Sequence, residues 1–492
     1  MLWAEVMTDP APLLEIEDLS FRYTKKSEPV FSNLHLTLNR GESALLMGPS
    51  GSGKSSLAYC IAGLYPRYAG VLEGQIQFAG ESVQQMPSSQ RAQHISILFQ
   101  NPDDQFCMDR VDREILFALE NINYQGDLAQ RVEELLEWVG LEGLQDQSLH
   151  HLSGGTKQKV ALATALATGA QLLILDEPFA NLDPESCELV LESLKKLQRR
   201  GLAFLIVDHK PNWWKDLVQR VLVLDAKGQI AKDSILPDQL PQHRDLFQSL
   251  GLYLDDQWLQ EYSPLKPNSD LPPAIVAENL TLYRGNRVLQ ENLSFQIPSG
   301  AITSLIGKNG VGKTTLLETI AGIHKPKGGL VLSGKPGLVF QNPRFQFIKL
   351  NVMEDVMATL EASGSQESES SLLARALMLL DEFGLKGSEN LSPYQLSQGQ
   401  QRRLALLSML AGNASILLLD EPTYAQDEKS TRTILRLLQD RVKSGLTVIM
   451  ATHDLSLAHA ISSKVLWMDK EGLTPTMEHL EIQMKEACPC AD

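Results

Sequence analysis

Short apolar runs alternate with helix-forming segments through most of the chain. The run at 43–47 (SALLM) comes before a glycine-rich loop, and the run at 171–176 (QLLILD) ends in an acidic residue. Apolar runs of roughly four to eight residues between turn residues are typical of strands buried inside a sheet. Their alternation with helices predicts an α/β fold, with a largely parallel sheet covered by helices.

The same motifs occur twice in the same order. Each half has a glycine-rich loop (GPSGSGKSS or GKNGVGKTT), an FQNP segment, an LS-x-G motif, a strand ending in Asp-Glu-Pro and an isolated histidine. Equivalent residues lie at similar separations: 259 positions for Lys54 and Lys313, and 244 positions both for Asp176 and Asp420 and for His209 and His453. From the loop lysine to the FQNP glutamine, the first half has 46 residues and the second 28. This repeat predicts two tandem domains that arose by duplication, followed by trimming of a peripheral strand region.

Proline and serine cluster between the two halves. The stretch LPDQLPQHRDLFQSLGLYL favours a short helix-bearing segment, whereas SPLKPNSDLPP is typical of a linker without regular structure. We expect a first domain at 12–232, a linker at 233–273, a second domain at 274–480 and a tail at 481–492. Cys488 and Cys490 leave metal binding by the tail open, and a disordered tail is the simpler interpretation.

Composition narrows the class of protein. A chain of 492 residues is long enough for two or three domains, each with a core of its own. No run of 18 apolar residues occurs, and the start of the chain, MLWAEVMTDPAP, lacks the pattern of a secretory signal. Five scattered cysteines indicate a reducing compartment, and a net charge of −16 argues against general nucleic-acid binding.

Both glycine-rich loops have the pattern of a phosphate-binding loop. Each follows an apolar strand and precedes a helix, so that backbone N–H groups and the helix N-terminus converge on phosphate oxygens. The lysine is expected to reach the β- and γ-phosphates of ATP, and the hydroxyl residue after it to bind Mg²⁺. The predicted ATP-binding residues of the two loops are Gly48, Ser50, Gly51, Gly53, Lys54, Ser55, Ser56, Gly307, Asn309, Gly310, Gly312, Lys313, Thr314 and Thr315.

Two carboxylates follow a buried apolar strand in each half. Such a pair is costly to bury unless it meets cations or hydrogen-bond donors. Asp176 and Asp420 are therefore predicted to assist Mg²⁺, and Glu177 and Glu421 to polarise the water that attacks ATP. An Asp-Glu-Pro tripeptide alone usually marks only a strand end. Its position after a phosphate loop is what favours a catalytic role for the two carboxylates.

A histidine and a glutamine complete the candidate chemistry of each half. His209 and His453 follow another apolar strand, 33 residues after the acidic pair, and are predicted to contact the γ-phosphate. Gln100 and Gln341 belong to the FQNP segments, and an amide side chain can accept a metal-bound water. The predicted catalytic residues are Lys54, Lys313, Glu177, Glu421, His209 and His453, and the predicted Mg²⁺ residues are Ser55, Gln100, Asp176, Thr314, Gln341 and Asp420.

The LS-x-G motifs, at 152–158 (LSGGTKQ) and 396–402 (LSQGQQR), each place a serine before a helix-forming stretch. A serine-capped helix start can bind an anion. Because each half already has a phosphate loop, we expect each motif to contact the nucleotide of the other half. The residues concerned are Ser153, Gly154, Gly155, Ser397, Gly399 and Gln400.

The full order of motifs resembles that of the ATP-binding cassette (ABC) ATPases, over nearly the whole chain. The resemblance implies two tandem P-loop NTPase domains, each with a mainly parallel core, an antiparallel β subdomain and a helical subdomain. It also implies that the two cassettes pair within the chain around two ATP molecules, with Ser397 completing the Lys54 site and Ser153 the Lys313 site.

The resemblance assigns four further residues to ATP binding. Asp183 (in NLD) and Asp427 (in AQD) match the D-loops of the family. Tyr23 (in LSFRY) matches the aromatic residue that stacks on adenine, and Tyr283 (in LTLYR) lies one position earlier in its motif. Gln398 stands where the family usually has glycine, and from this we predict modest asymmetry, with the Lys54 site slower.

The sequences around the FQNP segments resemble the energy-coupling-factor subfamily more closely. The resemblance rests on FQNPDDQF with VDREILFALEN and on FQNPRFQF with NVMEDV. It implies an importer ATPase at the cytoplasmic face of the cell membrane, with a transmembrane coupling protein and a membrane substrate-binding protein as partners. Phe106 and Phe347 would receive coupling helices, unless they belong to the core of the helical subdomain. The cargo, a vitamin, a vitamin precursor, cobalt or nickel, stays open.

A soluble tandem-cassette factor acting on the ribosome or another soluble assembly is the alternative. Such proteins typically have a long, charged helical linker, whereas the expected linker here is short and contains proline. Ribosome-recycling factors add a cysteine-rich N-terminal region, and the first cysteine here is Cys60. An exporter is a further possibility that the sequence leaves open.

Overall fold

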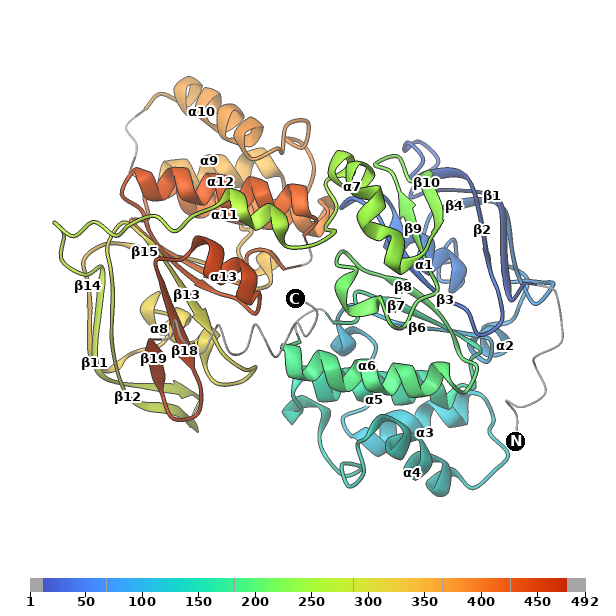
Figure 1. Ribbon diagram of the computed structural model, residues 1–492. Coiled ribbons are helices and arrows are strands. Elements are labelled where there is room, and N and C mark those ends of the chain that lie inside the picture. Colours follow the sequence, from blue (N-terminus) through green and yellow to red (C-terminus); the bar gives the residue numbers. More distant parts are fainter. Residues whose placement is uncertain are drawn as a thin grey trace. The chain divides into compact units, whose positions relative to one another are not determined.

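Two units make up the described chain. The computed structural model describes residues 12–67, 69–179, 182–285, 287–364, 367–424 and 426–475. Contacts divide it into one unit up to Asp255 and another from Asp256. Each unit has one sheet of six strands and a smaller antiparallel sheet, with helices packed around them (Figure 1). Cys488 and Cys490 lie outside the described residues.

The elements of the first unit follow the predicted alternation. Its strands are β1 (Leu14–Arg22), β2 (Phe31–Leu38), β3 (Ser43–Met47), β4 (Val71–Phe78), β5 (Glu81–Ser82), β6 (Ile95–Leu98), β7 (Leu172–Asp176), β8 (Ala203–Val207), β9 (Arg220–Leu224) and β10 (Ile230–Ile235). Its α-helices are α1 (Lys54–Ile61), α2 (Ser88–Ala92), α3 (Val111–Asn121), α4 (Leu128–Val139), α5 (Gly154–Ala167), α6 (Pro184–Gln198) and α7 (Arg244–Leu250).

The second unit repeats this order. Its strands are β11 (Ile275–Arg284), β12 (Arg287–Ile297), β13 (Ile302–Ile306), β14 (Lys327–Leu332), β15 (Pro336–Val339), β16 (Ile416–Asp420), β17 (Thr447–Ala451), β18 (Lys464–Met468) and β19 (Leu473–Pro475). Its α-helices are α8 (Lys313–Ile320), α9 (Val352–Ala362), α10 (Glu369–Glu382), α11 (Gln398–Ala411), α12 (Glu428–Lys443) and α13 (Leu455–Ile461).

The large sheets confirm the α/β fold predicted from the apolar runs. In the order β10-β9-β3-β8-β7-β6, neighbouring strands are parallel except for β9 and β10. The order β15-β16-β17-β13-β18-β19 repeats this arrangement, with β18 and β19 antiparallel. β3, β7 and β8 are buried at every position, as expected for strands covered on both faces.

The shorter segment of the second half corresponds to a smaller peripheral region. The antiparallel sheets have the orders β2-β1-β4-β5 and β12-β11-β14. Between the P-loop helix and the next strand of the large sheet, the first unit has β4, β5 and α2, where the described residues of the second unit have β14 alone. The difference in length between the halves therefore lies in the peripheral strand region, and trimming after duplication stays a prediction.

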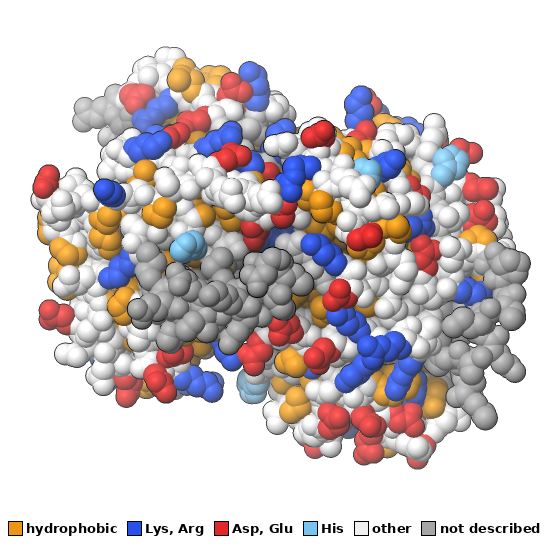
Figure 2. Space-filling view, in the orientation of Figure 1, with side chains coloured by type: hydrophobic (Ala, Val, Ile, Leu, Met, Phe, Trp, Pro, Cys, Tyr) orange, Lys and Arg blue, Asp and Glu red, His pale blue; other side chains and the backbone are white. Residues whose placement is uncertain are grey.

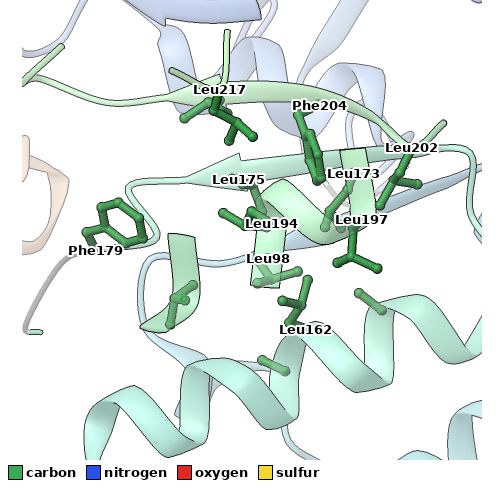
Figure 3. Packing of buried hydrophobic residues seen from close by; sticks show 14 of the residues in the cluster. Leu98, Leu162, Leu173, Leu175, Phe179, Leu194, Leu197, Leu202, Phe204 and Leu217 are labelled. Carbon is green, nitrogen blue, oxygen red and sulfur yellow. The ribbon is translucent and has the colours of Figure 1, made fainter. Parts of the chain in front are cut away.

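Alternate residues of the buried strands face two separate hydrophobic clusters. On one side, Leu173, Leu175 and Phe204 pack with Leu162 of α5 and Leu194 of α6, as Figure 3 shows. On the other side, residues such as Leu172 and Ile174 pack with α1 and the antiparallel sheet. Because alternate side chains of β7 pack into different clusters, the strand is held on both faces. This packing fixes the position of its carboxyl end, where the acidic pair lies.

The segment between the halves packs against both units. The expected helix-bearing stretch contains α7, and Leu240, Phe247 and Leu252 are buried in the core of the first unit. In the second unit, Trp258 is buried and lies 5.0 Å from the guanidinium of Arg432. Residues 263–273 form no helix or strand, as predicted for SPLKPNSDLPP.

Charges of both signs are spread over the surface. Figure 2 shows Lys and Arg side chains gathered over α6, whose last turn carries Lys195 and Lys196, although the chain is acidic overall. In the ranges that the structure describes, no helix combines the length and apolar character needed to cross a bilayer.

We expect Trp214→Phe to destabilise the first unit. Trp214 is fully buried, stacks on Phe179 with ring centroids 4.4 Å apart, and donates from Nε1 to Asp208 Oδ2 at 2.9 Å. Phenylalanine keeps the stacking and removes the donor to a buried carboxylate, which costs about 1–3 kcal/mol. Urea unfolding followed by far-UV circular dichroism measures the loss. Trp213→Phe is the control, because Trp213 is only partly buried; equal losses in the two variants would contradict the expected role of the hydrogen bond.

Candidate active sites

The two phosphate loops have the backbone that their glycines predict. Gly51 and Gly53 have φ of 84° and 89°, and Gly310 and Gly312 have φ of 79° and 114°. These are left-handed values that other residues rarely adopt. A Cβ at Gly53 would lie 2.6 Å from Val30 Cγ1, so this position excludes larger residues for a second reason. Each loop leads directly into a helix, α1 or α8, whose first backbone N–H groups face the loop.

The loop lysines bind the backbone of their own loops. Lys54 Nζ donates to the carbonyls of Gly48 at 2.7 Å and Pro49 at 3.0 Å. Lys313 Nζ donates to the carbonyls of Gly307 at 2.5 Å and Lys308 at 3.0 Å. Both lysines are buried. Their ammonium groups are thus held over the loop, where the phosphates of ATP are expected.

The predicted Mg²⁺ ligands are adjacent in both units. Ser55 Oγ donates to Asp176 Oδ1 at 3.0 Å, and Thr314 Oγ1 donates to Asp420 Oδ2 at 2.7 Å. Burial raises the pKa of Asp176 to about 7 and also raises the pKa of Asp420. A hydroxyl and a carboxylate next to a phosphate loop fit Mg²⁺, which usually takes one or two carboxylates and substrate phosphates. Within the described ranges, no three His, Cys, Asp or Glu side chains form an independent metal cluster.

The glutamate after each of these aspartates has strained backbone. Glu177 and Glu421 have φ of 47° and 50°, in the left-handed region. Strain of this kind in a residue other than glycine costs about 1–3 kcal/mol and is concentrated at functional sites. The backbone N–H of each glutamate donates to the next strand of the sheet, at Val207 O and Ala451 O. The strain therefore turns each glutamate out of its strand while the strand end stays fixed.

The predicted histidines lie against these glutamates. His209 Nε2 is 3.2 Å from Glu177 Oε1, and His453 Nε2 is 3.3 Å from Glu421 Oε1. Both pairs are largely buried. The two strand ends thus bring together, in each unit, a carboxylate able to polarise water and a histidine able to contact phosphate.

The two glutamates differ in their electrostatic surroundings. Burial acts to raise the pKa of Glu177, but the contacts with His209, Lys54 and Gln100 together outweigh it, and the pKa is lowered. For Glu421, burial and the neighbouring charge of Asp420 raise the pKa to about 8. A bound divalent cation would favour the ionised form of both groups. The two units are therefore not electrostatic copies of each other.

The glutamines of the FQNP segments are placed differently in the two units. Gln100 Nε2 donates to Glu177 Oε2 at 2.6 Å, so its amide contacts the acidic pair. Gln341 is exposed, and its backbone carbonyl accepts from Arg402 Nη2 at 2.8 Å. Their role as Mg²⁺ ligands stays a prediction.

The LS-x-G and D-loop residues are helix caps. Ser153 accepts from Thr156 N at 3.2 Å at the start of α5, and Ser397 accepts from Gln400 N at 3.3 Å at the start of α11. In the same way Asp183 is the N-cap of α6 and Asp427 is the N-cap of α12. The predicted serine-capped helix starts are confirmed. The side chain of Gln398 lies outside what the structure describes.

The two predicted adenine-stacking residues have different neighbours. Tyr23 is 49% exposed, and its hydroxyl lies 2.7 Å from Ser56 Oγ on the P-loop helix. The hydroxyl of Tyr283 accepts instead from Lys327 Nζ on β14 at 2.9 Å. The shift by one position in LTLYR thus directs Tyr283 to the antiparallel sheet. Tyr23, in contrast, contacts the P-loop helix of its own unit.

Sequence reasoning missed residues that hold these sites in place. Arg402 on α11 donates to main-chain carbonyls beside Glu421, and its counterpart five residues after the first LS-x-G serine is Gln158. Glu114 and Asp355 are buried acids that cap the segment after each FQNP motif. Each lies 14 residues after its FQNP glutamine. Comparison of the two halves position by position would have found both pairs.

Comparison with known proteins agrees with this geometry. A family described as ABC transporter matches residues 31–180 and 290–424. The chain belongs to the ABC transporter family. It is therefore an ABC ATPase with two P-loop cassettes, and cassettes of this family bind ATP, generally with Mg²⁺. His209, His453, Tyr23 and Tyr283 lie outside the matched ranges.

Similar proteins contain both cassettes. A Bacillus subtilis protein described as a putative HMP/thiamine import ATP-binding protein, YkoD, is 33% identical over 94% of this chain and 90% of its own length. A putative ABC transporter ATP-binding protein of Methanosarcina mazei is 32% identical over 93% of both chains. Among solved structures, ribosome-bound archaeal ABCE1 with Pelota covers 96% of this chain and 80% of that chain, with a TM-score of 0.67 and 19% identity. That last likeness shows the shared fold alone.

We expect Glu177→Gln and Glu421→Gln each to lower ATP hydrolysis. Each substitution removes the predicted water-polarising carboxylate of one cassette and keeps its size. The double variant is expected to lose activity by about 100-fold or more, as for the loss of a general base. The residual activity of Glu421→Gln should be the lower one, because the sequence predicts that the Lys54 site is slower. Phosphate release at saturating ATP measures this, and equal residual activities in the single variants would contradict the asymmetry.

We expect Tyr23→Ala to weaken nucleotide binding at one of the two sites. Stacking of a base on an aromatic ring contributes about 1–3 kcal/mol, which corresponds to roughly 5- to 150-fold in Kd. Calorimetric titration of ATP into the Glu177→Gln/Glu421→Gln chain measures the change. Tyr23→Phe keeps the ring and loses only the hydroxyl next to Ser56, so it should retain affinity. Loss of affinity in both variants would mean that the hydroxyl, and not stacking, is what matters.

Proposed function

We propose that this ABC ATPase drives a membrane importer, of the energy-coupling-factor type, for a vitamin, a vitamin precursor or a transition-metal ion. The observation that carries the proposal is an exposed apolar segment directly after Gln341. Phe345, Ile348 and Leu350 are 78%, 70% and 82% exposed. Exposed apolar side chains close together mark interaction sites. The description of the Bacillus subtilis relative as an import ATP-binding protein supports the same function.

Buried carboxylates hold this segment in both cassettes. Asp355 Oδ1 accepts from the backbone N–H of Ile348 at 2.8 Å and of Lys349 at 3.1 Å. In the first cassette, Glu114 Oε2 accepts from Cys107 N at 2.9 Å and Met108 N at 2.8 Å. Asp355 and Glu114 are 1% and 2% exposed, and burial raises the pKa of Asp355. A segment fixed in this way presents its side chains at low conformational cost, which favours docking.

The docking residues differ from those that the sequence suggested. Phe347 is 9% exposed and makes an edge contact with Tyr394, and Phe106 packs against the core of the first cassette. Both phenylalanines thus stabilise their cassettes from within. The side chains that remain accessible are Phe345, Ile348 and Leu350.

The corresponding segment of the first cassette has different chemistry. Counted from the FQNP glutamine, the residues at these three positions are Asp104, Cys107 and Asp109, and all three are exposed. We propose that the transmembrane coupling protein presents an apolar cytoplasmic segment to the second cassette and a basic one to the first. Unlike segments would fix the orientation of the chain beneath the membrane.

The proposed motor cycle follows from the site and this surface. ATP binding would close the cassettes, hydrolysis would reopen them, and the motion would reach the coupling protein through the docking segments. A membrane substrate-binding protein would select the cargo. Because the Bacillus subtilis relative is described as an HMP/thiamine import protein, HMP and thiamine are the first cargoes to test. The chain would act at the cytoplasmic face of the cell membrane.

We expect the variant Phe345→Asp/Ile348→Cys/Leu350→Asp to lose its membrane partners. These substitutions install the residues of the first cassette, and they remove the apolar surface without touching the core. Tagged chains are recovered from detergent-solubilised membranes of the host, and co-purified proteins are identified by mass spectrometry. The parent chain should recover a polytopic coupling protein and a small apolar partner, and the variant at least about tenfold less, as for the loss of an interface hot spot.

A second variant controls for the loss of exposed apolar surface in general. Leu377 and Met378 on α10 are 45% and 73% exposed, and Figure 2 shows hydrophobic side chains on this helix. The first cassette has Glu133 and Glu134 at the matching positions, so Leu377→Glu/Met378→Glu is a matched change. It should recover the partners like the parent. Equal recovery of these partners with all three chains would contradict docking through this segment. Recovery of ribosomal proteins instead would contradict the importer function and leave the ATPase assignment intact.

A further inference from the structure

A buried arginine links two parts of the second ATP site. Arg402, on α11, is 4% exposed. Its Nη1 donates to Glu421 O at 2.6 Å and to Asp420 O at 3.2 Å, and its Nη2 donates to Gln341 O at 2.8 Å. One guanidinium therefore joins the end of β16, where the acidic pair lies, to the loop that carries the FQNP glutamine.

This arrangement restricts relative movement of the two parts. A charged group is costly to bury, and the cost is offset only while its hydrogen bonds persist. The guanidinium is planar and rigid, so its donors have a fixed relative geometry. If the loop moved away from the strand end, a buried charged donor would lose its partner. The loop and the backbone of Glu421 should therefore move together.

The first cassette lacks this backbone link at the matching position, and its loop reaches the acidic pair through Gln100 Nε2, which donates to Glu177 Oε2 at 2.6 Å. Gln158 is 2% exposed, and its Nε2 has no hydrogen-bond partner among the described residues. The loop of the first cassette is tied to α5 by Lys157 and Asp103, whose Nζ and carboxylate oxygens are 2.6 and 2.9 Å apart. That ion pair joins the loop to α5 and does not involve the end of β7. The side chain of Asp103 is 52% exposed. An exposed ion pair of this kind is a weak constraint.

We propose that Arg402 is a positioning residue that couples the FQNP loop of the second cassette to Glu421. In this role the side chain does not act on the attacking water or on phosphate. It holds the backbone of Glu421 in place, and with it the position of the carboxylate. Through this link, the position of the loop controls hydrolysis at the second site. In the first cassette, which has Gln158 at this position, the loop contacts the side chain of Glu177 through Gln100 and, among the described residues, leaves the glutamate backbone without such a link. The proposal rests on the ATPase activity and on Glu421 as the polarising residue, and is independent of the importer function.

The test uses Arg402→Gln in a chain that also carries Glu177→Gln, so that hydrolysis reports on the second site. Glutamine is the residue of the first cassette, which makes it the substitution most compatible with the fold. We expect kcat to fall about tenfold or more, because small displacements of a catalytic group have effects of this order. The Kd for ATP should change less than threefold. Hydrogen exchange at residues 341–346 should become faster, since the loop is released from the strand end.

Two further variants make the result specific. Arg402→Lys keeps the positive charge but cannot make the three carbonyl bonds in the same geometry, so it should be as slow as Arg402→Gln. Gln158→Met, in a chain carrying Glu421→Gln, is the matched change in the first cassette and should alter kcat less than twofold. Glu421→Gln alone in the same assay shows whether Glu421 has the assumed role, and so separates a failure of that assignment from a failure of the proposal.

Three results would overturn the proposal. The first is a kcat within twofold of the parent in Arg402→Gln. The second is full activity in Arg402→Lys, which would mean that charge and not geometry matters. The third is a loss of exchange protection throughout the second unit in both variants, because Arg402 would then serve the stability of the whole unit and not the position of the loop.

Discussion

Each cassette is organised around two adjacent carboxylates at the end of a buried strand. In the first cassette, β7 is buried at every position and ends in Asp176, and Glu177 follows directly. Such a pair is tolerated only if its charges are paired or its oxygens accept hydrogen bonds. Ser55, Gln100 and His209 supply these contacts, and they come from the phosphate loop, the FQNP loop and the end of the next strand. The requirement to satisfy one buried pair thus assembles three distant segments of sequence into one site.

The duplicated chain satisfies this requirement in two different ways. In the first cassette, the amide of Gln100 and the ring of His209 contact Glu177, and the side chain of Tyr59 acts to lower the pKa of Asp176. In the second, the residue at the Tyr59 position is Glu318, and the buried cation Arg402 stabilises the strand end through its carbonyls. Despite burial, contacts with His209, Lys54 and Gln100 lower the pKa of Glu177. In contrast, burial and the charge of Asp420 raise the pKa of Glu421, although Arg402 acts to lower it. Identical motifs therefore do not imply identical electrostatics.

The sequence was sufficient for the fold because the fold follows from patterns with a physical period. Apolar runs predicted the buried strands, and the paired motifs predicted the two phosphate loops, their adjacent Mg²⁺ ligands and the serine-capped helices. What it could not supply depends on three-dimensional neighbours. The left-handed φ of Glu177 and Glu421 cannot be predicted from the residue types, because glutamate rarely adopts it. The inward position of Phe347, beside the exposed Phe345, depends on how one loop turns. The difference between Gln158 and Arg402 at matching positions can be interpreted only when the atoms around each residue are known.

The contacts of the second cassette form a continuous path from its exposed apolar segment to its catalytic strand. Asp355 holds the backbone at Ile348 and Lys349, and Gln346 Nε2 donates to Ala405 O on α11 at 2.7 Å. One turn earlier on the same helix, Arg402 binds both Gln341 O and Glu421 O. Each step is a short hydrogen bond with a buried or partly buried partner, so displacement at one end cannot be absorbed freely by side-chain motion. A partner that moved this segment would therefore act on the backbone of Glu421 through α11. In the first cassette, Lys157 and Asp103 join the loop to α5 at the surface, and Gln100 Nε2 joins the loop to the side chain of Glu177. The first cassette thus links its loop to the side chain of the catalytic glutamate, and the second links its loop to the backbone of that residue, so displacement of the two loops would act on the two glutamates in different ways.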